Sequence, residues 1–290
     1  MARKEYWLIS TEHLSDRIWF QEEEDFVVAM NMVAVIALLV PVRVLCFVLM
    51  SNHVHFVLES SYEDAFEFIC KFKQFYSRYV SKKYGQKKML RRNDVDILQL
   101  GLKPESLERA IAYVLMNPVA ANICTFPSQY PWGCGSVFFN QNHSTGKTIG
   151  SLSERGRYRI FHCNATLPPS YELTPEGFVS PLNYIPIRFV ENLFQTPKRF
   201  SYFLMNSSKA KSRLEKDPLP SFRDQTILAA IPDLCRTLFR KDSFDNLSSE
   251  ERPEFFQQLR RRFSADVAQL ARITGLEYST VSRYLDAPSV

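Results

Sequence analysis

The stretch from Val44 to Ser60, VLCFVLMSNHVHFVLES, places the strongest constraint on how this chain can fold. It contains two apolar runs separated by the polar step Ser51-Asn52, and such runs are typical of buried β-strands. Side chains alternate between the two faces of a strand, so His53 and His55 should share one face. Two imidazoles side by side on a rigid sheet form half of a divalent-metal site. The alternative is a pair of hydrogen-bonded polar residues at a strand end.

The segments around this stretch predict an α+β fold. We expect an order of strand, helix, strand, strand and helix over residues 5–11, 22–40, 42–50, 53–59 and 63–84. Acidic residues open the first helix, while Pro41 and Gly85 end the two helices. This order suits a small antiparallel sheet with helices on one face, of the ferredoxin-like type. Another helix is expected at 104–116, closed by Asn117-Pro118.

Composition changes divide the chain into three expected parts. A first domain covers residues 1–145, an irregular, proline-rich connection covers 146–220, and a helical region covers 221–290. Within the last part, residues 264–286 have the pattern of a helix-turn-helix with Gly275 at the turn. An ordinary helical hairpin is the alternative. As a DNA-binding unit, its second helix would present to DNA the residues Tyr278, Ser279, Thr280, Ser282 and Arg283.

Charge and cysteine usage limit the possible environments and partners. The net charge of +5 permits a polyanionic partner. The six cysteines form no C-x-x-C pair and fit reduced thiols of the cytoplasm. The N-terminus lacks a secretory signal, and no apolar stretch is long enough to span a bilayer. We therefore expect a cytoplasmic protein without a membrane partner.

The predicted helix at 63–84 is both basic and aromatic. Cations on such a helix can contact phosphates, and its rings can stack on bases. The cations predicted here to bind DNA are Lys71, Lys73, Arg78, Lys82, Lys83, Arg91 and Arg92. A solvated basic face is the alternative. Near a metal half-site, a tyrosine of this helix becomes a candidate nucleophile, because a metal can activate the phosphate that a phenol attacks.

Four stretches carry a resemblance to a known family. They are L-M-S-N-H-V-H-F-V-L, Tyr76-Ser-Arg-Tyr79-Val80, Ala112-Tyr-Val-Leu-Met-Asn117-Pro118-Val-Ala-Ala, and Tyr130-Pro-Trp132-Gly-Cys-Gly-Ser136. In this order they resemble the HUH endonuclease superfamily, and more narrowly its single-tyrosine transposases of the insertion-sequence and REP-associated (RAYT) kind. The resemblance covers roughly residues 5–139, about half of the chain.

The resemblance implies a DNA transposase-like nuclease and strand transferase. His53 and His55 would bind Mg²⁺ or Mn²⁺, and a tyrosine would attack single-stranded DNA near a hairpin to give a 5′-phosphotyrosine and a free 3′-hydroxyl. Tyr76 is the predicted nucleophile, with Tyr79 as the second choice. Such a protein would associate with the prokaryotic nucleoid, as a homodimer or a monomer.

The chain also departs from the family pattern. Where the family commonly has an Asn or Gln metal ligand after the nucleophile, this chain has Val80 and Ser81, and Asn122 stands where a glycine is usual. The third metal ligand is therefore not assigned. The alternative function is a domesticated, catalytically weak protein that binds DNA hairpins. A metal hydrolase is the least favoured reading, because no H-E-x-x-H motif is present.

Overall fold

The fold was obtained as a computed structural model. It describes residues 5–11, 18–85, 90, 94–101, 103–142, 146–162, 166–207, 222–263 and 265–286. Its centre is a four-stranded antiparallel sheet of β1 (Glu5–Thr11), β2 (Arg43–Met50), β3 (His53–Ser60) and β4 (Val95–Gln99), in the order β2-β3-β1-β4. With α1 (Glu23–Leu39) before β2 and α2 (Tyr62–Tyr84) before β4, the connectivity is that of the ferredoxin-like split βαβ fold. The predicted α+β class is confirmed.

Local sequence signals explain where the two long helices begin and end. The Asp25 carboxylate accepts hydrogen bonds from the backbone N–H groups of Gln21 and Glu22, at 2.8 and 3.2 Å, and so closes the start of α1. Helix α2 is capped by Ser61, whose hydroxyl accepts from the backbone of Asp64. It ends at Gly85, which adopts the left-handed conformation with φ of 68°.

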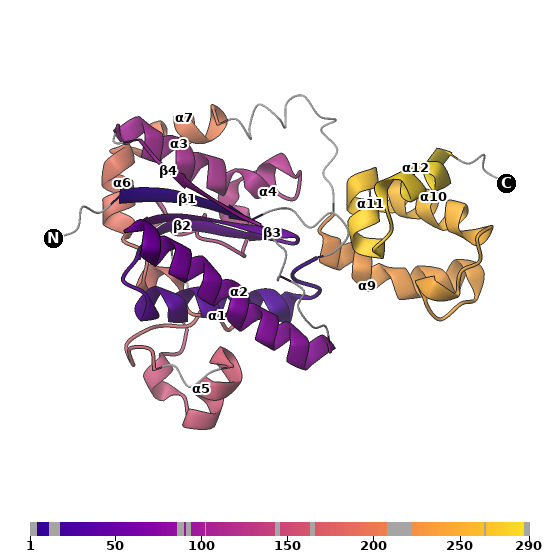
Figure 1. Ribbon diagram of the computed structural model, residues 1–290, viewed down its shortest axis with the longest axis horizontal. Helices are drawn as coiled ribbons and strands as arrows, with labels where there is room; N and C mark the ends of the chain where they lie inside the picture. Colours follow the sequence, from indigo (N-terminus) through magenta and orange to yellow (C-terminus); the bar gives the residue numbers. More distant parts are fainter. Residues whose placement is uncertain are drawn as a thin grey trace.

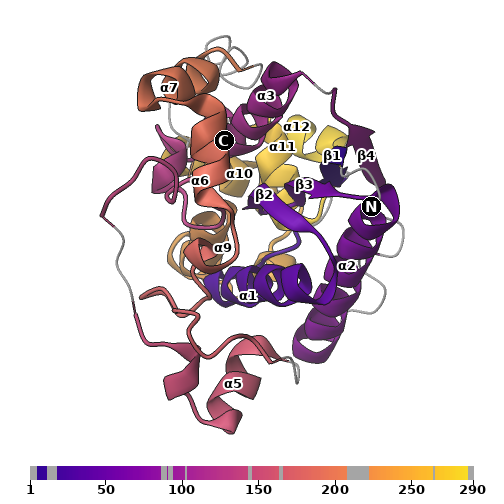
Figure 2. The same ribbon diagram turned by 90° about the vertical axis from the view of Figure 1, so that its left-hand side faces the viewer.

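The sheet is covered on both faces. Helices α1 and α2 lie together on one face, and α3 (Pro104–Leu115) lies on the other (Figure 1, Figure 2). On the first face, Phe56 of β3 packs against Phe68 and Phe72 of α2. Its neighbour His55 points to the opposite face and meets Tyr113 of α3. Helix α3 covers β2 and β3, a position that the sequence did not indicate.

The loop that follows α3 closes the outer edge of β2. The short helix α4 (Asn117–Ala120) leads into it. The Tyr130 hydroxyl donates to the carbonyl of Leu49 at 2.8 Å, and Gly133 bridges to Val48. A Cβ atom at Gly133 would lie 2.9 Å from the carbonyl oxygen of Phe47, so this close approach requires glycine. These contacts hold the loop against β2.

The region expected to be an irregular connection packs on the first domain instead. It contains α5 (Glu154–Phe161), α6 (Ile187–Phe194) and α7 (Pro197–Met205). Val190 and Phe194 of α6 belong to the same core as the sheet. The first domain thus extends to at least residue 207. The sequence does not predict this packing, because the helices of this region are short and each buries only a few side chains, so no hydrophobic period is visible.

The C-terminal region forms a separate helical unit with its own core. It comprises α9 (Asp224–Leu234), a π-helical turn (Cys235–Phe239), α10 (Glu251–Phe263), α11 (Val267–Thr274) and α12 (Tyr278–Asp286). Gly275, with φ of 70°, makes the turn between α11 and α12, which gives the predicted helix-turn-helix. The buried Asp224 of α9 holds α11 through Arg272, whose guanidinium donates two hydrogen bonds of 2.8 and 3.0 Å.

Single turns of 3₁₀ helix complete the secondary structure, at Pro127–Gln129, Ile149–Ser151, Pro181–Asn183 and Phe244–Asn246. Across the ranges that the structure describes, no helix has both the length and the apolar character needed to cross a bilayer.

Candidate functional site

The two histidines of β3 lie together on the face of the sheet that α3 covers. The ring centroids of His53 and His55 are 4.8 Å apart and the rings meet edge to face. Both side chains are largely enclosed, with exposed fractions of 5% and 2%. The alternation of side chains along a strand therefore predicted their arrangement correctly.

Neighbouring polar groups hold each imidazole in place. Nδ1 of His53 donates to the side-chain oxygen of Asn52 at 2.8 Å, and Nδ1 of His55 shares a 2.8 Å hydrogen bond with the hydroxyl of Ser10. Ser10 stands directly across from His55 in the β1–β3 ladder. Both hydrogen bonds fix the rings, and at His53, where Nδ1 is the donor, the neutral imidazole carries its metal-binding lone pair on Nε2. This is the support that metal-ligating histidines usually have.

The donor set at the pair fits half of a site for a divalent cation. Within the described ranges, no group of three His, Cys, Asp or Glu side chains gathers to hold a metal. Two imidazoles would supply only two of a cation's ligands, and the Nε2 atoms that would bind it are buried under α3. His53 and His55 are the residues that would hold a metal here, and metal binding by this pair stays a prediction.

Tyr113 of α3 is the tyrosine next to the histidine pair. Its ring centroid lies 5.6 Å from that of His55, in an edge-to-face contact. The phenol is half-buried, and desolvation raises its pKa above the ordinary value. Asn117 fixes the end of α3 by donating from its amide to the carbonyls of Tyr113 and Val114, at 3.0 and 3.2 Å. The sequence indicates that Asn117-Pro118 ends this helix, but no local pattern assigns a role to Tyr113.

The predicted nucleophile Tyr76 lies on the other side of the sheet. Its ring is fully buried and packs against those of Trp19 and Phe72, and its hydroxyl donates to the carbonyl of Trp19. Burial raises the pKa of Tyr76 well above its ordinary value, and the nearby charge of Asp25 raises it further. Because the sheet separates Tyr76 from the histidines, the two do not form one site.

The second choice, Tyr79, is also on the far face. Its hydroxyl donates to Asp25 at 2.9 Å and accepts from Lys83 at 2.9 Å. Desolvation raises the pKa of this phenol, and Asp25 raises it further against the opposing effect of Lys83. The geometry thus gives Tyr79 a structural role in joining α2 to the start of α1.

The basic residues predicted on α2 divide into several environments. Lys83 is committed to ion pairs with Glu22, Glu24 and Asp25 of α1. Lys71 pairs with Glu67 at 3.2 Å, the Arg78 guanidinium lies 6.0 Å from the ring centre of Phe75, and Lys82 is exposed. Desolvation lowers the pKa of Lys73. Arg91 and Arg92 lie outside the described residues.

The second helix of the helix-turn-helix presents most of its predicted DNA-facing residues to solvent. Tyr278, Ser279 and Arg283 are exposed, whereas Thr280 and Ser282 are half-buried. Val281 between them is fully buried and anchors the helix in the C-terminal core.

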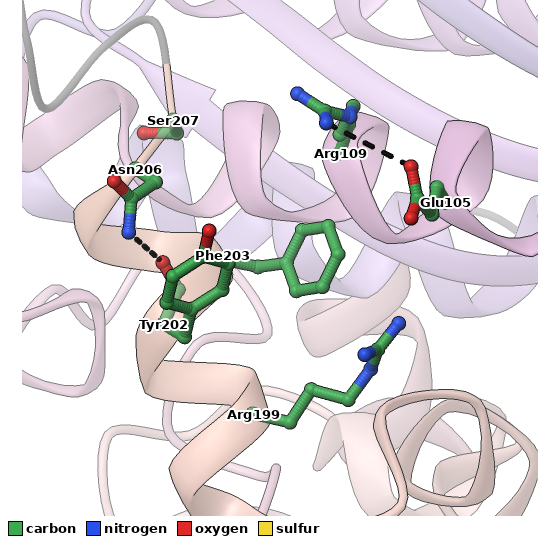
Figure 3. Close-up of a pocket in the computed structure, with 7 residues that line it drawn as sticks. All are labelled: Glu105, Arg109, Arg199, Tyr202, Phe203, Asn206 and Ser207. Carbon is green, nitrogen blue, oxygen red and sulfur yellow. Dashed lines mark hydrogen bonds and ion pairs between the residues drawn. The ribbon is translucent and has the colours of Figure 1, made fainter.

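A surface pocket of about 430 Å³ lies between α3 and α7 (Figure 3), and neither histidine lines it. It is lined by Glu105, Arg109, Arg199, Tyr202, Phe203, Asn206 and Ser207. Arg199 is engaged by the buried Glu108 through hydrogen bonds of 2.8 and 2.9 Å. The pocket therefore lies beside the ion pair of Arg199 and Glu108 that joins α7 to α3.

Comparisons with known proteins do not place the chain in a family: no protein-family model, no curated protein and no solved structure matches it. Functional inference therefore depends on the geometry of this chain.

Proposed function

We propose that this chain is a metal-assisted tyrosine nuclease and strand transferase of the HUH kind, with Tyr113 as its nucleophile. The observation that carries the proposal is the meeting of His53, His55 and Tyr113 on one face of a ferredoxin-like sheet. Nucleophilic catalysis needs a positioned side chain and a means of activating either it or the substrate. Tyr113 would be the positioned side chain, and a cation held by the two histidines would activate the substrate phosphate.

In the proposed reaction, the phenolic oxygen of Tyr113 attacks the phosphorus of a phosphodiester in single-stranded DNA. An oxygen–phosphorus bond forms to the 5′-phosphate, and the bond from phosphorus to the 3′ oxygen breaks. The phenol proton passes to solvent, and the leaving oxygen takes up a proton to become a 3′-hydroxyl. The phosphotyrosine keeps the energy of the phosphodiester, so rejoining to another strand needs no nucleotide cofactor.

The chain's own residues hold the reacting groups in position. Ser10 and Asn52 orient the two imidazoles, and Asn117 fixes the last turn of α3 that carries Tyr113. Such preorganisation lowers the barrier because the reactants need little further ordering. Mg²⁺ or Mn²⁺, when bound by the histidines, would polarise the scissile phosphate as a Lewis acid.

The helix-turn-helix supports DNA as the substrate. Its exposed Tyr278, Ser279 and Arg283 suit contacts to phosphates and base edges in the major groove. We propose that this unit binds double-stranded DNA beside the hairpin that the first domain cuts.

Covalent adduct formation tests the proposal. Labelled hairpins from the DNA flanking the gene, each with a single-stranded tail, are incubated with the full chain and Mn²⁺ and resolved on a denaturing gel. Wild type and Tyr76→Phe should give a shifted covalent band, and Tyr113→Phe and His53→Ala should not. A band that survives in Tyr113→Phe but disappears in Tyr76→Phe would overturn the assignment of the nucleophile.

A second candidate function is a DNA-binding protein that no longer cuts. The observation in its favour is the donor set of only two imidazoles within the described residues. Tight binding of the hairpins, with no adduct in Mg²⁺ or Mn²⁺, would select this function.

A further inference from the structure

Helix α5 stands apart from both the histidine site and the helix-turn-helix. It projects on the α1 side of the first domain, away from the sheet, in both views (Figure 1, Figure 2). It is nevertheless firmly anchored, because Phe161 is buried in a small core with Val35 of α1. Asn31 of α1 also donates to the carbonyl of Ile160 at 3.4 Å and accepts from the backbone of Val179 at 2.8 Å. The helix is thus a fixed feature of the surface.

The outward face of α5 is basic and aromatic. Arg155, Tyr158 and Arg159 follow the i, i+3, i+4 spacing of one helical face, and His162 follows as the left-handed C-cap; all four are exposed. Tyr158 alone leaves 51% of its surface in solvent. Within the described ranges, the guanidinium groups of Arg155 and Arg159 are in no ion pair. The two guanidinium groups, one helical turn apart, are therefore available to bind an anionic partner.

At its C-terminal end α5 contacts α2. The ring of His162 meets that of Tyr79 at 5.1 Å between centroids. Desolvation lowers the pKa of His162, and the positive charges of Lys82 and Lys83 lower it further, against the opposing charge of Glu24. Lys83 is neutralised by its own ion pairs, but Lys82 is exposed. The basic face of α5 thus borders a cluster of mixed charge at the end of α2, and the arginines of α5 carry its positive charge.

We propose that this face of α5 binds the phosphate backbone of the double-stranded stem of the DNA hairpin. The inference rests on the proposed function and adds a positioning surface to it. A projecting helix with arginines about 5–6 Å apart suits consecutive phosphates of a duplex. A single strand would need a groove with stacked rings instead. Since the sheet lies between α5 and Tyr113, contacts here hold the stem without taking part in cutting.

The test measures binding of the full chain to a blunt hairpin stem without a single-stranded tail. Fluorescence anisotropy gives the affinity between 50 and 200 mM salt for wild type and for the double variant Arg155→Ala/Arg159→Ala. The slope of log affinity against log salt should become shallower by about 2, because two phosphate contacts are lost. The double variant Arg188→Ala/Lys198→Ala removes equal charge from exposed positions of α6 and α7 and should leave the slope unchanged.

Two results would overturn the proposal. One is a salt dependence that does not distinguish the two double variants. If the slope is unchanged in the α5 variant, the arginines do not contact phosphates; if it changes equally in both variants, net charge alone accounts for the change. The other is loss of binding to vesicles of phosphatidylglycerol, with stem binding unaffected, which would assign the face to an anionic lipid surface. Adduct formation is scored separately on a tailed hairpin. If wild type forms no adduct, the proposed nuclease activity is refuted, whereas the proposal that α5 binds the stem is not.

Discussion

Arg272 should be one of the few single side chains on which the C-terminal unit depends. Its partner Asp224 is 2% exposed, and the arginine side chain itself is 20% exposed. In Arg272→Met the aliphatic stem remains, but among the described residues the Asp224 carboxylate keeps only the amide of Gln269, at 2.9 Å, as a side-chain donor. Breaking a buried ion pair from one side costs about 3–5 kcal/mol. Partial exposure of the arginine favours the lower end, about 3 kcal/mol.

Thermal unfolding of the full chain, followed by circular dichroism, measures this effect. For a unit of this size, 1 kcal/mol corresponds to a shift of about 4–8 °C in Tm, so about 3 kcal/mol should lower the C-terminal transition by at least 12 °C. Hydrogen exchange of residues 222–286 assigns the transition. Arg236→Met serves as the matched control, because its pair with Asp233 lies in solvent and should contribute little.

The outcome can contradict the reasoning in two ways. A loss below about 1 kcal/mol would mean that Asp224 is effectively solvated, like a surface ion pair. Failure of the double variant Arg272→Met/Asp224→Asn to recover stability would show that the unpaired charge is not the cause.

Four further outcomes are expected. Tyr76→Phe removes one hydrogen bond, so urea unfolding should show a loss of about 1 kcal/mol with adduct formation intact. Lys83→Ala removes the cation that pairs with the buried Asp25, so the free energy of unfolding should fall by about 2 kcal/mol while DNA affinity is unchanged. Lys82→Ala should weaken DNA binding and leave stability unchanged. Equal effects of the two variants on stability and on affinity would contradict the assignment. Because desolvation raises the pKa of Tyr113, its phenolate is scarce at neutral pH, and the single-turnover rate of adduct formation should rise about tenfold per pH unit from 7 to 9; a flat profile would argue against attack by this phenol. Chelation with EDTA should abolish the adduct but not binding, and Mn²⁺ should restore it.

The sheet and the histidine pair were predictable because their signals are local. Two apolar runs, a two-residue step and strict alternation define β2, β3 and the shared face of His53 and His55 without knowledge of the rest of the chain. The turn glycine of the helix-turn-helix is a signal of the same kind.

The tyrosine was not predictable in this way because the choice depends on which face of the sheet each helix covers. Phe72, Tyr76 and Val80 repeat every four residues, and such a stripe faces the core. That pattern favoured burial of Tyr76, but the expected metal site lay next to it only if both shared a face. Tyr113 reaches His55 because α3 crosses the opposite face, which no spacing along the chain encodes.

The histidines occupy an interior strand, bonded along both edges to β2 and β1. Such a strand cannot shift by itself. The conformational entropy of bringing the two ligands together is therefore lost when the domain folds, and cation binding carries no further cost of this kind. Loop fluctuations on heating should therefore leave the spacing of the imidazoles unchanged. The capacity to hold a cation should disappear in one cooperative step, together with the fold of the first domain.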